Sequence, residues 1–165
     1  MAGYEGEYNP SKVVLTVGNP TGAGGVAVPI PGFATLSIAS GRAPDSFITA
    51  ARTNDTFTIV VGADGDATHV RSQDKTGPIG LVLTDGSGFN TLISLLQLAQ
   101  ESELIPDFTI PVTITDQNST PPTVVFGSNC KVQRPADYEA GASDGTNTWT
   151  FLPAELSIVH QGRVF

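Results

Sequence analysis

Residues Thr109 to Thr115 read Thr-Ile-Pro-Val-Thr-Ile-Thr, and this short stretch indicates how most of the chain folds. Ile110, Val112 and Ile114 fall on one side of an extended chain and threonines on the other, because successive side chains of a strand point to opposite faces. Such alternation is typical of a strand with one buried and one polar face. Pro111 has no N–H to donate, so we expect an edge position or a bulge there.

Segments of similar composition lie on both sides of this stretch. Eighteen glycines and twelve prolines divide the 165 residues into short runs rich in Thr, Val, Ile and Phe. This rhythm is typical of an all-β protein. The predicted strands are 12–17, 34–39, 46–52, 56–61, 68–72, 79–84, 109–115, 123–126, 130–134, 147–152 and 154–160.

A glycine-rich turn separates the strands predicted at 56–61 and 68–72. It reads Gly62-Ala-Asp-Gly-Asp66, and Asp-Gly between two apolar runs is a strong signal for a hairpin turn. The carboxylates superficially suggest a calcium loop. An EF-hand, however, needs ligands spread over about twelve residues and ending in a bidentate Glu, which this segment lacks. We therefore interpret it as a turn.

One segment, 90–103, carries its apolar residues at helical spacing. They are Leu92, Ile93, Leu95, Leu96, Leu98 and Ala99. This pattern predicts a single α-helix whose apolar stripe either covers an open face of a sheet or packs on a neighbouring subunit. Ser87 or Asn90 can accept a backbone N–H as the N-cap, and Pro106 prevents the helix from continuing.

The chain is long enough for one domain and too short for two. We expect a single mainly β domain over residues 1–165, with the one helix on its flank. Two stretches lack any periodicity. They are a long loop at about 18–32 and an irregular loop at about 135–146, and long loops in compact domains are usually functional.

Charge excludes some classes of function. Sixteen acidic and eight basic side chains give a formal net charge of -8, whereas nucleic-acid binders need clustered Lys and Arg to neutralise phosphates. The N-terminal stretch has acids where a secretion signal needs basic residues before an apolar run. No run approaches the roughly eighteen apolar residues of a membrane span. We therefore expect neither a signal peptide nor a membrane anchor.

Residues that could carry catalysis or bind a metal are few. Cys130 is the single cysteine, so no intrachain disulfide or thiolate zinc cluster can form. His69 and His160 are the two histidines, both fall in predicted strands, and neither belongs to a catalytic triad motif. The Thr21–Gly25 segment is glycine-rich but lacks the Lys-Ser/Thr ending of a phosphate loop. The sequence predicts no catalytic, metal or cofactor site, and no enzyme.

Several short motifs occur in a fixed order along the chain. The first half holds Asp45-Ser-Phe47, Val61-Gly-Ala-Asp-Gly65, Val70-Arg-Ser72, Asp74 to Gly77 and the predicted helix; the second holds Thr123-Val-Val-Phe126, Lys131-Val-Gln-Arg-Pro135, Tyr138, Glu139, Asn147-Thr-Trp-Thr-Phe151 and Glu155-Leu. In this order and spacing, from about Tyr8 to Gly162, the chain resembles the tail tube proteins of bacteriophages with contractile tails. It departs from their pattern in the insertion at 18–32, at Thr53-Asn-Asp55, and in the loop 141–146.

The resemblance implies a β-sandwich or barrel-like subunit. Six subunits would close into a ring, and such rings would stack to form the inner tail tube. It implies a place in the virion after assembly in the host cytoplasm. The implied partners are other copies of the chain, the tail sheath protein, and the baseplate and tail terminator proteins. The tape measure protein and DNA would pass through the channel without specific DNA binding.

An acidic channel would let DNA pass during ejection without adhering, because like charges repel within a Debye length of about 8 Å at physiological salt. Strand alternation does not reveal which face is inside. The candidate lumen-facing acids are Asp45, Asp55, Asp64, Asp66, Asp74, Asp85, Asp116, Glu139 and Asp144.

Loops with few apolar anchors are candidates for contacts between consecutive rings. The residues expected there are Gly22, Gly24, Gly25, Arg42, Asp45 and Asn54. Deleting Gly22 to Gly25 is expected to weaken stacking while leaving the single subunit folded.

Two other readings stay open. The chain could be a related ring-forming component, such as a tube initiator, a tail terminator or an injection-system tube. Alternatively it could be a monomeric β-sandwich that binds a sugar or another small ligand through Trp149 and Tyr138. Trp149 alternates with Phe151 on a predicted strand, which favours core packing over sugar stacking. Self-assembly separates these readings, because a tube protein polymerises, a terminator stops at one ring and a ligand-binding module stays monomeric.

Overall fold

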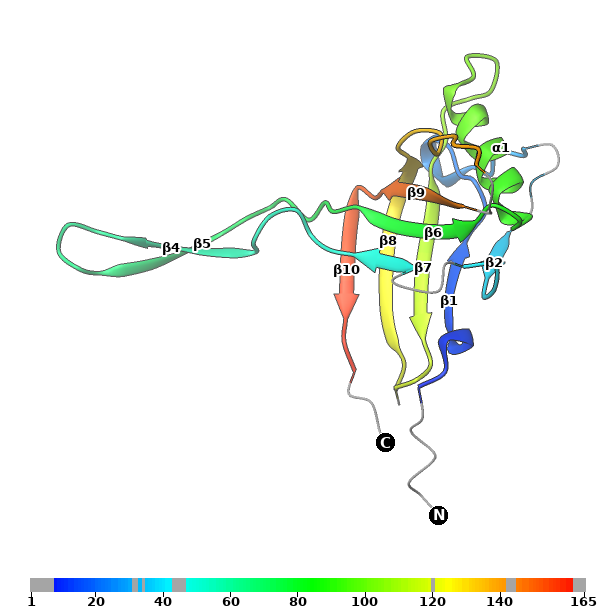
Figure 1. The fold of residues 1–165 in the computed structure, drawn as a ribbon. Coiled ribbons are helices and arrows are strands. Elements are labelled where there is room, and N and C mark those ends of the chain that lie inside the picture. Colours follow the sequence, from blue (N-terminus) through cyan, green and yellow to red (C-terminus); the bar gives the residue numbers. More distant parts are fainter. Residues whose placement is uncertain are drawn as a thin grey trace.

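The computed structural model describes residues 8–30, 33, 35–42, 47–119, 121–141 and 145–161. Within them the chain forms a mainly β protein with one α-helix, as the sequence predicts (Figure 1). The strands are β1 (Val13–Val17), β2 (Leu36–Ile38), β3 (Ile48–Ala50), β4 (Phe57–Val61), β5 (Ala67–Arg71), β6 (Ile79–Thr84), β7 (Ile110–Asp116), β8 (Thr123–Val132), β9 (Thr146–Leu152) and β10 (Glu155–Val159). The helix is α1 (Phe89–Glu101), and short 3-10 turns lie at Pro10–Lys12 and Ala23–Gly25.

Two antiparallel layers share strand β8. Its first half pairs with β7 and β10, and β1 and β2 extend that layer on the far side of β7. Its last residues pair with β9, and β6 and β3 continue the second layer. Figure 1 shows that β3, β6 and β9 run across the direction of β1, β7, β8 and β10. This is the arrangement of an orthogonal sandwich, in which one strand bends from one sheet into the other.

The core lies between the two layers and α1. The sheets contribute the fully buried side chains of Leu15, Leu81 and Ile110. The helix contributes those of Ile93 and Leu96. These are the alternating strand positions and the helical stripe that the sequence pattern marks as apolar. The helix therefore covers one face of the sandwich, the first of its two predicted roles.

The strands predicted separately at 123–126 and 130–134 are in fact one strand, β8, and the predicted break was wrong. The residues between the two predicted strands, 127–129, belong to β8, and the backbone changes direction there without leaving the sheet. Asn129 has a φ of 50°, and Gly127 lies where a Cβ would come 2.9 Å from Ile79 Cδ1. The missing side chain of Gly127 and the left-handed backbone conformation of Asn129 together allow the strand to pass from one layer to the other.

Pro111 lies at a bulge, as predicted, but β7 is not an edge strand. The register between β7 and β8 shifts between Ile110 and Val112, and β7 has β1 as its second neighbour. The Pro111 carbonyl accepts a hydrogen bond from Gly18 N at 2.9 Å. The bulge thus accommodates the missing N–H inside the sheet.

The predicted side-chain caps are confirmed only in part: Ser87 Oγ accepts a hydrogen bond from Phe89 N at 3.4 Å, although Ser87 is not the N-cap residue. The N-cap position is Gly88, which has no side chain to accept a bond. Asn90 instead donates to Thr84 O at 2.9 Å and accepts from Trp149 Nε1 at 2.9 Å. Its amide is used to join the helix to β9 rather than to satisfy the helix terminus.

Candidate assembly surfaces

The β4–β5 hairpin, residues 57–71, extends from one side of the body, and we call it the arm (Figure 1). Its five cross-strand pairs run from Phe57 opposite Arg71 to Val61 opposite Ala67. The predicted Asp-Gly turn closes it: Gly62 N donates to Asp66 O at 2.8 Å, and Gly65 has a φ of 85°. Every residue of both strands is exposed.

Both faces of the arm are rich in apolar side chains. One face carries Phe57, Ile59 and Val61 together with Arg71 and His69, because these residues lie opposite one another in the register. Phe57, Ile59 and Val61 are 59%, 62% and 63% exposed. The other face carries Thr58, Val60, Thr68 and Val70. Neighbouring exposed apolar side chains of this kind are typical of an interaction site.

The base of the arm is fixed to the body at strand β10. Arg52 Nε donates to Leu156 O at 2.9 Å, and Leu156 N donates to Lys75 O at 2.8 Å. Lys75 Nζ also lies 3.4 Å from Glu155 Oε1. The arm is therefore a projection with a defined direction, although among the described residues its two strands pair only with each other.

The sandwich ends in short outer strands. Strands β2 and β3 have three residues each and one strand neighbour each. Strand β10 has β8 on one side and the base of the arm against Leu156 on the other. Short edges limit uncontrolled pairing and leave room for pairing with another copy.

An apolar groove of about 810 Å³ lies where the 18–32 loop meets the segment after α1. Ten residues from 22–29 and 104–107 line it, and Asp107 is the only charged one. Val26 is 67% exposed and Leu104 is 96% exposed. The 18–32 loop is held in place because Thr21 exchanges two backbone hydrogen bonds with Thr109, at 2.8 and 2.9 Å.

A smaller polar pocket of about 260 Å³ lies beside β9. Arg134, Asp137 and Glu139 line it together with threonines of the strand. Tyr138, the residue predicted to form an aromatic groove with Trp149, is 92% exposed, whereas Trp149 is buried and bonded to Asn90. Trp149 is thus a core residue, as its alternation with Phe151 predicted.

The candidate lumen-facing acids come from several parts of the chain. Asp45 and Asp144 fall outside the described residues. Asp64 and Asp66 lie in the turn of the arm, and Asp55 and Asp74 lie at its base. The other three are Asp85 after β6, Asp116 at the end of β7, and Glu139 in the polar pocket.

Asp74 organises the base of the arm. Its carboxylate accepts hydrogen bonds from Thr76 N at 2.9 Å and Thr76 Oγ1 at 2.7 Å, and from the Asn54 amide. These bonds, chiefly the one from the Thr76 side chain, lower the pKa of Asp74 below its ordinary value. The carboxylate is therefore charged at neutral pH and ties the two segments of the base together.

The candidate inter-ring residues fall into two groups. Gly22, Gly24 and Gly25 lie close together in the 18–32 loop, and Gly22 lines the apolar groove. Arg42 has an internal role: it donates to Val13 O and to Ala39 O, and its guanidinium stacks 4.3 Å from the Phe47 ring centroid. Asn54 bonds Asp74 at the base of the arm, and Asp45 lies outside the described residues.

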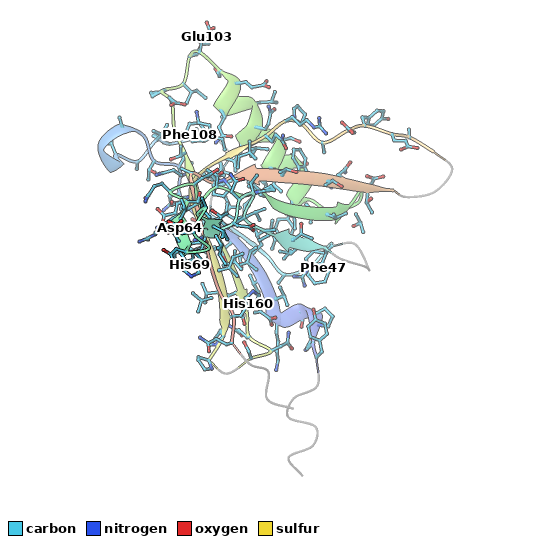
Figure 2. The ribbon with its side chains drawn as sticks, turned by 90° about the vertical axis from the view of Figure 1, so that its left-hand side faces the viewer. Phe47, Asp64, His69, Glu103, Phe108 and His160 are labelled. Carbon is cyan, nitrogen blue, oxygen red and sulfur yellow. The ribbon has the colours of Figure 1, made fainter. Side chains whose placement is uncertain are left out.

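The residues considered for catalysis are dispersed. His69 is exposed on the arm and His160 follows β10, as Figure 2 shows. Cys130 is buried, and desolvation raises the pKa of its thiol to about 12. In the part of the chain that the structure describes, no three His, Cys, Asp or Glu residues cluster as a metal site would require. Across those same residues, no helix has the length and apolar character to cross a membrane.

Sequence reasoning missed the exposure of the arm. It predicted strands at 56–61 and 68–72 with a turn between them, and made no prediction of how exposed they are. The signal was the run Ile59-Val60-Val61, which fills both faces of the strand with apolar side chains. Such a run is typical of a strand buried on both faces, and this one is covered on neither.

Comparison with known proteins gives results at the level of structure. No family model matches the sequence, and no curated protein matches it. The tube-terminating cap of the anti-feeding prophage matches with a TM-score of 0.52 at 12% identity, over 94% of this chain and 92% of that chain. The fold is shared with contractile injection machinery.

Two further solved structures give the same result. The sheath/tube terminator of an extracellular contractile injection system, PVC, has a TM-score of 0.52 at 11% identity, over 93% of this chain and 97% of that one. A chain of the PVC sheath-tube complex has a TM-score of 0.51 at 10% identity, over 96% and 93%. At these identities the likeness establishes the fold, and the roles in those assemblies belong to those proteins.

Proposed function

We propose that this protein is a non-enzymatic structural subunit of a contractile tail or contractile injection system, and that its ring terminates the tube. The observation that carries the proposal is the fold match to two tube terminators over 92% or more of both chains. This reading replaces the tube subunit, the first expectation from the sequence, with the terminator that stood as its alternative.

The surfaces of the chain support a role in self-assembly. The arm exposes apolar side chains on both faces, and the groove exposes others on a different part of the body. Two different patches on one chain, if they bind each other, produce a head-to-tail contact that either closes into a ring or continues as a helix. A terminator requires the closed form.

The expected partners follow from that role. A terminal ring would contact the last ring of the tube on one side and the sheath at its outer surface. A formal charge of -8 on each copy would repel DNA phosphates or other acidic cargo in the channel and prevent stalling by counterion-release binding. Asp64 and Asp66 in the turn of the arm are the acids best placed to contribute to such a wall if the arms reach the channel.

The tube subunit itself is a second candidate. It is favoured by the match to a chain of a sheath-tube complex, which covers 96% of this protein. A tube subunit must bind copies above and below, whereas a terminator has one axial face that accepts no further copy.

Negative-stain microscopy of the purified chain separates the candidates. Single rings of uniform height, at every concentration at which assembly occurs, support the terminator. Open-ended cylinders that lengthen with concentration support the tube subunit. A particle that stays monomeric at high concentration, and neither forms rings nor binds preformed tubes, contradicts both.

A further inference from the structure

The arm lacks the support that a hairpin normally needs. Two-stranded hairpins are marginally stable in water unless a third strand, a helix or another surface covers them. All ten strand residues of the arm are exposed, and its three most exposed large apolar side chains, Phe57, Ile59 and Val61, share one face. That face is the part of the arm that gains most from being covered.

The apolar groove is the matching concave surface. Its volume of about 810 Å³ and its lining by small and branched side chains leave room for several apolar side chains. Leu104 and Val26 stand exposed at its sides. A groove of this kind between two loops gives an apolar projection a place to bind.

The arm and the groove of one chain lie apart. Figure 1 shows the arm extending sideways from the layer of β3 and β6, whereas the segment that follows α1 lies at the end of the body. In Figure 2 the view is along the arm, with Asp64 and His69 towards the viewer, and Glu103, the residue before Leu104, lies away from them at the top of the molecule. The arm's base is fixed at β10, so the arm does not fold back onto its own groove.

We propose that the arm of one copy docks, by the face carrying Phe57, Ile59 and Val61, into the apolar groove of the next copy. This deepens the proposed function, on whose self-assembly it rests, by naming the two surfaces that join the copies. The contact is heterologous, because a convex patch meets a different, concave one.

Charge favours a second copy as the occupant of the groove. The docking face of the arm carries Arg71 opposite Phe57, and His69 opposite Ile59. Two acidic residues lie at the groove: Glu103 directly precedes Leu104, and Asp107 lines the groove, where Lys131 already pairs with it at 2.6 Å. Arg71 has an acidic partner in Glu103 when the arm lies in the groove of another copy.

Disulfide trapping tests the contact directly. One copy carries Ile59→Cys and the other carries Val26→Cys, and the two are mixed under mild oxidation. The buried Cys130 stays unreactive. We expect a disulfide-linked heterodimer at least ten times more abundant than with the control pair, in which Tyr138→Cys replaces Val26→Cys. Tyr138 is more exposed than Val26, so simple accessibility predicts the opposite order.

Matched point variants test the face. Ile59→Asp is expected to abolish assembly, whereas Thr58→Asp, one residue away on the opposite face, leaves it intact. Both sites are exposed on the same strand, so a general effect of charge on the arm would affect both alike. Arg71→Glu is expected to weaken assembly, and adding Glu103→Lys to the same chain restores it.

The results separate failure of this contact from failure of the proposed function. If the Ile59→Asp variant still forms rings like those of the wild type, and the cysteine pair yields no trapped heterodimer, the docking is overturned. The proposed function is left intact by that result. A disulfide between two copies of the Ile59→Cys variant overturns the docking as well. So does an intrachain disulfide in a chain that carries both Ile59→Cys and Val26→Cys. No rings, no tube binding and no trapped heterodimer refute both together.

Discussion

At the scale of single residues, Gly77 is the position where the backbone has least room. It is buried, and a Cβ there would come 2.7 Å from the Cα of Arg52 and collide with the carbonyl of Ala51. The two segments that form the base of the arm can approach this closely only because residue 77 has no side chain. The sequence shows the glycine but not the reason for it.

Gly77→Ala is therefore expected to destabilise the fold by about 1–3 kcal/mol, because backbone atoms cannot move aside as a flexible side chain can. The free energy of unfolding is measured by urea denaturation followed through the fluorescence of Trp149. Gly86→Ala is the control, since a Cβ at Gly86 meets nothing within 4 Å. Equal destabilisation by both substitutions would contradict the close approach.

The buried thiol of Cys130 makes stability depend on alkaline pH. Burial raises its pKa to about 12, whereas a thiol in the unfolded chain titrates near about 8.5. Above that lower pKa the unfolded chain loses the proton first, so stability is complete below about pH 8.5 and falls as the pH rises towards 12. Cys130→Ala should flatten this decline, and an unchanged pH profile would show that the thiol is not desolvated.

At the scale of elements, the arm is the least protected pair of strands. Its backbone bonds join only β4 to β5 and are open to water on both faces. Amides of 57–61 and 67–71 are expected to exchange within seconds in the monomer, and at least a hundredfold more slowly in the assembled ring. Hydrogen exchange read by mass spectrometry measures this. Amides of β7, which has neighbours on both sides, are the internal control and should be protected in both states.

The link between α1 and β9 depends on one side-chain amide. Asn90→Ala leaves Trp149 Nε1 without the oxygen that now lies 2.9 Å away, and an unpaired buried donor costs about 1–3 kcal/mol. Because Trp149 is the only tryptophan, its emission should also change in the folded state. Asn147→Ala on the same strand is the comparison, and an equal loss there would argue against a specific role for the Asn90 bond.

The elements also show what sequence alone could predict. Alternation located the strands and the helix, and Asp-Gly located the turn of the arm, because these signals are local. The bend of β8 at Gly127 and Asn129 was taken for a break, since local residues do not reveal that a strand joins two layers. The exposure of Ile59 was missed for a similar reason: periodicity shows which residues share a face, but not whether that face finds a partner in the same chain.

At the scale of the whole molecule, net charge opposes assembly. Each copy carries a formal charge of -8, and like charges on neighbouring copies repel until salt screens them, over about 10 Å at 0.1 M. The assembled fraction is therefore expected to rise several-fold between about 0.02 and 0.2 M salt. Asp64→Asn with Asp66→Asn should lower the salt required. Assembly that instead weakens steadily with salt would show that ion pairs outweigh the net repulsion.

The arm is inserted in the chain between β3 and β6, and this position determines how the molecule resists a mechanical force applied to the arm. In Figure 1 the arm continues the direction of β6, and β6 is held by six consecutive residue pairs with β9, which in turn joins β8. Traction on the arm therefore loads that ladder in shear, so that many bonds must rupture at once rather than open one by one. The subunit is therefore expected to resist unfolding when the force of a contracting assembly reaches it through the arm.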